Sequence, residues 1–167
     1  MKKKNQENKK DLTDFHQPLL EKETTKMYSG VSEREVLGIL LKDDKLINSV
    51  LKYIPTSKVF YHEKHEIIWK GMYALYKQNK AIDLATLTNY LSEKGYKMTY
   101  YLSGIEIIST ARLEEHAKTI YSLYVRRQLH EKILRFEARL REQTSYKDVS
   151  SDINYLQNIG EKFSNVL

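Results

Sequence analysis

The sequence contains no cysteine and only two prolines and six glycines among its 167 residues. The lack of cysteine excludes a disulfide framework, a thiolate nucleophile and thiolate metal ligands, and it fits a cytoplasmic protein. The scarcity of proline and glycine leaves few tight turns for connecting strands, so the composition favours helices. No apolar run approaches the roughly 20 residues that a membrane-spanning helix needs, and we expect no membrane contact.

Motifs of the common enzyme classes are also missing. The sequence has no GxxxxGK[ST] phosphate-binding loop, no GxSxG nucleophile turn and no HExxH zinc motif. His62, His65 and Glu66 lie close together in "HEKHE", but a metal site needs further ligands that the sequence does not offer. We therefore interpret His65 as a buried histidine on an apolar helix face and His62 as a surface residue. We predict no catalytic residue, no cofactor and no metal.

The first part of the chain divides into a tail and a helical region. Residues 1–31 are polar, rich in lysine and without periodicity, which predicts a flexible tail. Ser32 and Glu35 have the spacing of a capping box, so we expect the first firm helix to begin there. Asp44 is the expected cap of the next helix.

Two further helices are predicted from apolar spacing and terminal signals. One carries a stripe that recurs every three or four residues and should be buried: His65, Ile68, Trp69, Met72 and Tyr76. The next is expected to have Asp83 as its N-cap, to end at Gly95 and to turn three leucines inward: Leu84, Leu87 and Leu91. Residues 32–111 should thus form a compact all-α bundle of about five or six helices.

Residues 112–167 differ in kind from the bundle. No glycine or proline interrupts residues 113–142, which predicts one long helix. After a polar break, a second apolar series continues to the end of the sequence at nearly heptad spacing. Two such helices joined by a short polar loop are typical of an antiparallel helical hairpin.

The apolar face of this hairpin is too long for the two helices to cover by themselves. Each large apolar side chain left in water forgoes roughly 1.5–3 kcal/mol of burial. The rest must pack on the bundle of the same chain or on a second copy, and two hairpins would form a four-helix interface. We predict a homodimer or higher oligomer with these interface residues: Val125, Leu129, Ile133, Phe136, Leu140, Ile153, Leu156 and Phe163.

The net charge of the chain is +6, and much of this excess of basic over acidic residues lies on the long helix. Five residues are candidates for nucleic-acid contact: Arg126, Arg127, Lys132, Arg135 and Arg139. The simpler interpretation is a solvated outer face, because long amphipathic helices commonly carry charge there. Glu131 precedes Arg135 by four residues and can pair with it. We therefore expect DNA contact to be weak or indirect.

A set of motifs in a fixed order resembles one family. These motifs are "SEREVLGILL" at 32–41, Phe60, Tyr61, His65, Ile68 and Trp69, then "IDLATL" at 82–87 with Leu91 to Gly95, and "HAKTIYSLYVRRQL" at 116–129. Together they resemble the N-terminal domain of the bacterial replicative DNA helicases of the DnaB type. The resemblance covers about residues 32–167.

This resemblance implies a globular helical domain followed by a hairpin that pairs between subunits in a collar of dimers. It also implies contacts with primase or a helicase loader, and no catalysis by this part alone. Because the sequence ends about where the family's linker begins, we expect the motor ATPase domain to be absent from it. Two alternatives remain open at this point: the helicase-docking domain of a primase or a small adaptor of the same fold, and a basic DNA-binding module.

Overall fold

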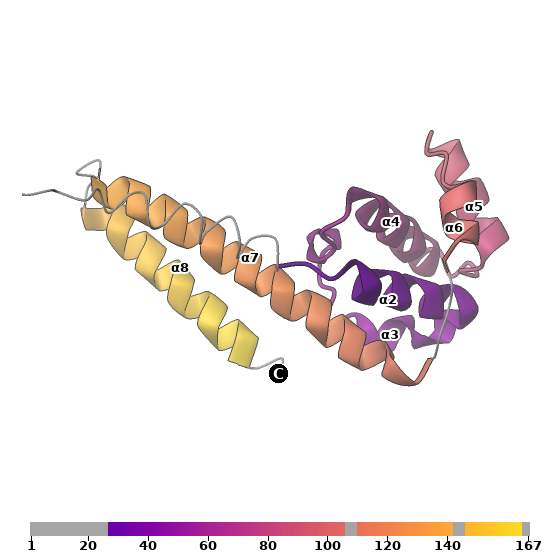
Figure 1. The fold of residues 1–167 in the computed structure, drawn as a ribbon, viewed down its shortest axis with the longest axis horizontal. Coiled ribbons are helices and arrows are strands. Elements are labelled where there is room, and N and C mark those ends of the chain that lie inside the picture. Colours follow the sequence, from indigo (N-terminus) through magenta and orange to yellow (C-terminus); the bar gives the residue numbers. More distant parts are fainter. Residues whose placement is uncertain (1–26, 106–109, 142–145, 165–167) are drawn as a thin grey trace, which may run out of the picture.

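The computed structural model describes residues 27–105, 110–141 and 146–164. Within these ranges the chain forms seven α-helices and three short 3-10 helices, and no strand. Figure 1 shows helices α2 to α6 grouped at one end, with α7 and α8 side by side extending from the group. The prediction of an all-α bundle followed by an antiparallel hairpin is confirmed.

The bundle and the hairpin have these bounds. The bundle comprises α2 (Gly30–Lys42), α3 (Ile47–Val50), α4 (Glu63–Lys77), α5 (Leu84–Glu93) and α6 (Thr99–Ser103). The 3-10 helices span Asp44–Leu46, Ser57–Val59 and Thr110–Arg112. The hairpin is formed by α7 (Leu113–Arg141) and α8 (Tyr146–Ser164).

The start of α2 differs from the predicted capping box. The helix begins at Gly30, and the hydroxyl of Ser29 accepts a hydrogen bond from the backbone N–H of Ser32 at 3.2 Å. Ser32 therefore lies in the first turn, and the box with Glu35 was wrong. Serine caps equally well at either position, and the earlier start adds a turn that brings Glu33 beside the beginning of α4.

Two of the other predicted helix ends are confirmed and one is shifted. Asp43, not Asp44, caps the 3-10 helix before α3, and the carboxylate of Asp44 instead accepts the backbone N–H of Ile82 at 3.1 Å. Asp83 accepts the N–H of Thr86 at 2.8 Å and caps α5 as predicted. Gly95 follows α5 with a φ of +86°, a conformation that glycine adopts without the strain of a side chain.

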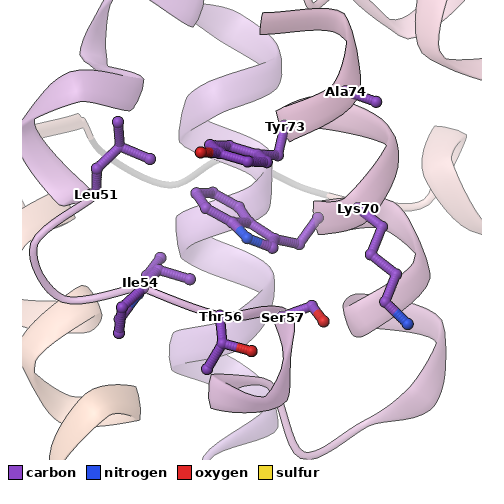
Figure 2. A pocket seen from close by; sticks show the side chains of 9 residues that line it. Leu51, Ile54, Thr56, Ser57, Lys70, Tyr73 and Ala74 are labelled. Atoms are coloured by element: carbon purple, nitrogen blue, oxygen red, sulfur yellow. The ribbon is translucent and has the colours of Figure 1, made fainter. Parts of the chain in front are cut away.

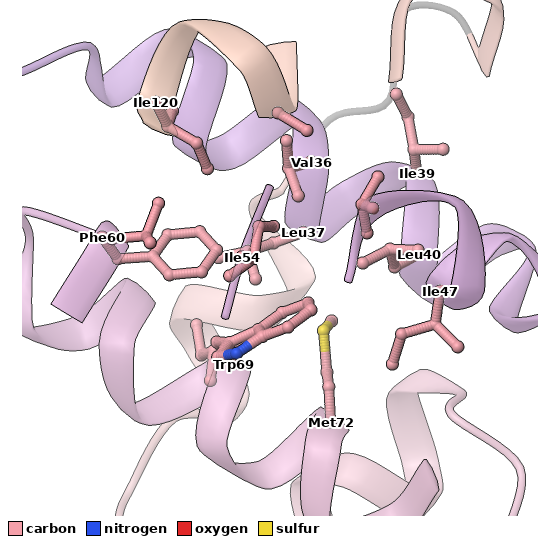
Figure 3. Packing of buried hydrophobic residues seen from close by; sticks show 14 of the residues in the cluster. Val36, Leu37, Ile39, Leu40, Ile47, Ile54, Phe60, Trp69, Met72 and Ile120 are labelled. Atoms are coloured by element: carbon pink, nitrogen blue, oxygen red, sulfur yellow. The ribbon is translucent and has the colours of Figure 1, made fainter. Parts of the chain in front are cut away.

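The core lies between α2, α4 and the first half of α7 (Figure 3). Leu37 and Leu40 of α2 lie near Trp69 and Met72 of α4, and all four are buried. The predicted stripe of α4 is confirmed apart from Tyr76, which is half-buried and donates its hydroxyl to Asn48 Oδ1 at 2.6 Å. The predicted inward leucines of α5 are buried at Leu87 and Leu91.

The exception in α5 is Leu84, which is 44% exposed. It is the first residue of the helix and faces solvent, so the expectation that it faces inward was wrong. Gly71 of α4 lies where α4 packs against Leu87 and Leu91 of α5. A Cβ built at Gly71 would lie 2.8 Å from Cδ1 of Leu87, so the absence of a side chain allows the two helices to approach closely.

The boundaries between tail, bundle and hairpin also need correction. Residues 27–31, assigned to the tail, include the cap and first turn of α2, while residues 1–26 lie outside the described ranges. The bundle was predicted to end at residue 111, yet Leu113, Ala117 and Ile120 of α7 are buried in its core. These residues were assigned to the hairpin because no glycine or proline separates them from the rest of the long helix.

Candidate functional site

The hairpin is held together by polar as well as apolar contacts. Arg139 of α7 donates to Asp152 of α8 at 2.5 Å, and Asp152 is only 7% exposed. Closer to the bundle, the ammonium of Lys132 lies 4.2 Å from the centre of the Tyr155 ring. These two pairs fix which faces of α7 and α8 are turned toward each other.

Seven of the eight predicted interface residues have described side chains, and they fall into three groups. Val125 is 6% exposed and belongs to the core of its own chain, so any self-association rests on the others. Leu129, Phe136 and Leu156 are half-buried within the chain. Three residues are largely exposed: Ile133 at 51%, Leu140 at 55% and Ile153 at 44%. The side chain of Phe163 lies outside the described residues.

The three exposed residues share one geometric property. Ile133 directly follows Lys132, Leu140 follows Arg139, and Ile153 follows Asp152. Each preceding residue contacts the opposite helix, and one further residue rotates a side chain by 100° around the helix axis. In two antiparallel helices that rotation leads to the same side of the pair. The three apolar side chains therefore share one long side of the hairpin, which we call the hairpin stripe.

The candidate nucleic-acid residues are mostly engaged within the chain. Arg135 pairs with Glu131, as expected from their spacing, and Arg139 and Lys132 contact α8. Arg126 is exposed. Arg127 is the most heavily committed, because its guanidinium donates to the carbonyl oxygens of Met27 at 2.6 Å and Val59 at 2.8 Å.

Arg127 also lies among aromatic rings. Its guanidinium carbon is 5.5 Å from the centre of the Tyr61 ring and 5.8 Å from that of Tyr124. Tyr61 in turn stacks on Tyr28 with ring centres 4.6 Å apart. Burial lowers the pKa of Arg127 from its ordinary value, but the group remains charged at neutral pH. Arg127 thus joins α7 to residues 27–28 and 58–61 rather than facing solvent.

A second polar network connects α2, α4 and α6. Glu33 Oε2 lies 2.6 Å from Nδ1 of His65, and the hydroxyl of Tyr101 lies 2.5 Å from Nε2 of the same ring. The Glu33 carboxylate also accepts the backbone N–H groups of Tyr61 at 2.9 Å and His62 at 3.2 Å. Burial acts to raise the pKa of Glu33, but these hydrogen bonds and the nearby imidazole outweigh it and hold the pKa below its ordinary value.

This network was not predicted, although His65 itself was correctly placed on a buried face. Its partners are 32 and 36 residues away in the sequence, a separation at which helical spacing carries no information. The one available signal was that a buried imidazole needs polar partners. Both oxygens of the Glu33 carboxylate accept hydrogen bonds from backbone N–H groups at the start of α4. We therefore interpret the network as structural: it holds three helices together, and Glu33 is not placed to act as a general base.

Of the other residues of "HEKHE", His62 adjoins this network, with its ring 5.2 Å from that of His65, whereas Glu66 belongs to a separate set of ion pairs. The His62 ring meets those of Tyr28 and Tyr61 edge-on, and Glu66 pairs with Lys58 and Lys70 at 3.2 and 2.8 Å. Within the ranges that the structure covers, no three His, Asp or Glu side chains are arranged to hold a metal ion. Nor is any helix in those ranges sufficiently long and apolar to cross a membrane.

Comparison with known proteins shows which family has this architecture. The sequence model of the family described as "DnaB-like helicase N terminal domain" matches residues 25–122, which include the bundle and the first part of α7. The chain belongs to this family. The matched region of these helicases is the N-terminal, non-catalytic domain. The resemblance noted in the sequence is therefore confirmed.

Two similar helicases carry the same region. A probable replicative DNA helicase of Trieres chinensis is 31% identical over 110 residues, covering 61% of this chain and 24% of the relative. Replicative DNA helicase DnaB of Rhodothermus marinus is 32% identical over 103 residues, covering 58% of this chain and 11% of the relative. The matches thus span about a quarter and a tenth of the relatives' lengths.

A solved structure shows the DnaB-like fold directly. The crystal structure of the N-terminal domain of DnaB helicase from Mycobacterium tuberculosis superposes with a TM-score of 0.68 at 20% sequence identity. The superposition covers 79% of this chain and 96% of the other. That extent exceeds the bundle alone, so the likeness of fold includes residues of the hairpin.

Proposed function

We propose that this chain is an assembly and docking domain of a replicative DNA helicase, acting in the cytoplasm during DNA replication. It self-associates through the hairpin, contributes to a collar of dimers, and docks primase or a helicase loader. The proposal is supported by membership of the DnaB-like family and, in the structure, by one observation above all: the hairpin stripe of Ile133, Leu140 and Ile153 is exposed.

The stripe favours a second hairpin as its partner for physical reasons. Three large apolar side chains on one side of the hairpin leave apolar surface exposed to water. Burying that surface against a partner would stabilise the complex by roughly 25 cal/mol per Å². Half-buried Leu129, Phe136 and Leu156 lie on the adjoining faces and would gain further burial from a partner. Two copies facing each other give a self-complementary four-helix packing, the arrangement expected of a symmetric dimer.

Sedimentation equilibrium of the chain and of two matched variants tests self-association. Ile153→Asp places a charge in the hairpin stripe, whereas Leu84→Asp places the same charge on α5 at the same 44% exposure. We expect Ile153→Asp to weaken the dimer by about 100-fold, or about 2.8 kcal/mol, and Leu84→Asp to leave it unchanged. A wild-type chain that stays monomeric at high concentration, or equal effects of the two variants, would contradict the proposal.

The docking role has its own test. In a pull-down, the purified chain is immobilised and incubated separately with intact primase, loader or helicase from the same organism. Our proposal expects direct capture of primase or loader. Capture of intact helicase alone, with neither of the others, would support the alternative in which the chain is a primase-type or adaptor domain that binds the helicase.

A further inference from the structure

The outer surface of α4 has two depressions, one on each side of Lys70, which we call the α4 surface. The first has a volume of about 310 Å³, and its apolar lining includes Leu51, Ile54, Trp69 and Tyr73. In Figure 2, Leu51, Ile54, Thr56 and Ser57 lie opposite Tyr73 and Lys70 of α4. Its size suits an apolar side chain of a binding partner.

The second depression, of about 220 Å³, lies between α4 and the end of α5. It is lined by Ile67, Leu91, Tyr90 and Tyr96 together with Lys70 and Lys94. Lys70 thus belongs to the rim of both depressions. A ligand that fills the two at once must pass over its ammonium group.

The charges of the α4 surface are of one sign where a ligand would touch it. Among the described residues that line the two depressions, none is acidic, and Lys70 and Lys94 are basic. Glu66, which pairs with Lys70, lines neither depression; its side chain is 12% exposed and held between Lys58 and Lys70, whose side chains are 71% and 59% exposed. The lysines therefore face outward while the carboxylate does not.

These features distinguish a peptide from a nucleic acid as the ligand. Single-stranded nucleic acid stacks on a series of exposed aromatic faces. Here Trp69 is 3% exposed and lies against the Tyr73 ring, with ring centres 6.3 Å apart. The exposed rings, Tyr73 at 37% and Tyr96 at 44%, line different depressions and do not form one stacking platform. Aliphatic walls such as Leu51 and Ile67 suit an apolar side chain, as in peptide-binding grooves. The lysine rim adds selectivity for carboxylates.

We propose that the α4 surface docks an acidic segment of a partner protein, with one large apolar side chain in each depression and a carboxylate at Lys70. This inference rests on the docking role proposed above and names its location and chemistry. The site lies on the bundle, so it stays available when the hairpin stripe is covered by a second copy.

The intrinsic fluorescence of Trp69 provides the test, because it is the sole tryptophan of the chain. The full chain is titrated with a synthetic helix-forming peptide that carries leucines and glutamates. We expect a saturable change in Trp69 emission. Peptides with leucine replaced by alanine, or glutamate by lysine, should bind at least about tenfold more weakly. The first lacks the apolar side chains that fill the depressions, and the second lacks the carboxylates that pair with Lys70.

Matched variants locate the binding site. Lys70→Glu should weaken the acidic peptide about tenfold and improve binding of the lysine peptide, as complementary charge requires. Lys147→Glu makes the same change in net charge on exposed α8 and should alter neither. No saturable signal, equal effects of Lys70→Glu and Lys147→Glu, or a stronger response to a single-stranded oligonucleotide would overturn the inference.

Sedimentation of the same samples separates this inference from the proposed self-association. A chain that dimerises but gives no peptide signal refutes the α4 site and leaves the role of the hairpin intact. A chain that stays monomeric but binds the acidic peptide through Lys70 refutes the dimer and retains the docking site.

Discussion

Glu33 and His65 form a buried pair, 2.6 Å apart, that links α2 to the first turn of α4. The side chain of Glu33 is 1% exposed and that of His65 is 2% exposed. Tyr101 extends the pair to α6, so three helices of the bundle meet at one imidazole. Because α4 has no side-chain cap of its own at His62, the Glu33 carboxylate supplies the acceptors that this helix start needs.

Replacing the carboxylate of Glu33 should make stability depend differently on pH. Glu33→Gln removes the charge that His65 and two backbone N–H groups share, and we expect unfolding free energy to fall by about 1–3 kcal/mol at pH 7. The folded protein holds the pKa of Glu33 below its ordinary 4.5. The stabilisation is therefore present above pH 4.5 and is lost as pH falls through the lower, folded value.

Urea unfolding of wild type and Glu33→Gln between pH 7 and pH 3 measures this effect. The difference between the two should shrink as the pH falls below about 4.5. Glu93→Gln, on the exposed surface of α5, serves as the control and should change stability by less than about 0.5 kcal/mol. Curves for wild type and Glu33→Gln that stay parallel over the whole range would count against the network.

Arg127 should matter for stability and its neighbour Arg126 should not. Arg127→Lys keeps the charge but replaces two terminal nitrogens, which reach Met27 and Val59 separately, by a single nitrogen, so we expect a loss of about 1–3 kcal/mol in unfolding free energy. Arg126→Lys on the exposed face should stay within about 0.5 kcal/mol of wild type. Chemical denaturation measures both. Equal stability of the two variants would show that Arg127 does not hold residues 27 and 59.

Two glycines in helices should respond to alanine in opposite directions. A Cβ at Gly71 would lie 2.8 Å from Leu87 and 3.0 Å from Leu91, so Gly71→Ala should cost about 1–3 kcal/mol by displacing these two buried side chains. Nothing lies within 4 Å of a Cβ at Gly160 in α8, where alanine should stabilise the helix by about 0.5–1 kcal/mol. Thermal unfolding followed by circular dichroism checks both signs, and a stabilising Gly71→Ala would contradict the packing described for α4.

The helices themselves could be predicted because their signals are local. The apolar stripe of α4, the Asp83 cap and the Gly95 stop each depend on residues within a few positions of one another. Cap positions were less certain, since Ser29 and Ser32, like Asp43 and Asp44, satisfy the same local rule. Tertiary contacts chose between them, and such contacts cannot be read from spacing.

The candidate site was only partly predictable for a similar reason. Apolar residues recur every three or four positions from Val125 through Ile133 to Leu140, so the sequence shows one continuous seam. The structure divides it, because α7 leaves the bundle part-way along its length and only Ile133 and Leu140 remain exposed. Arg126 and Arg127 are likewise adjacent and chemically identical, yet only Arg127 points toward the backbone of residues 58–59.

Helix α7 belongs to two parts of the molecule at once. It runs for 29 residues, or about 43 Å, and is interrupted by no glycine or proline. One end is buried beside Ile120 in the bundle while the other carries Leu140 toward the hairpin tip. A partner that tilts the outer end of the hairpin must therefore either bend α7 or disturb the packing of α7 against α2 in the bundle.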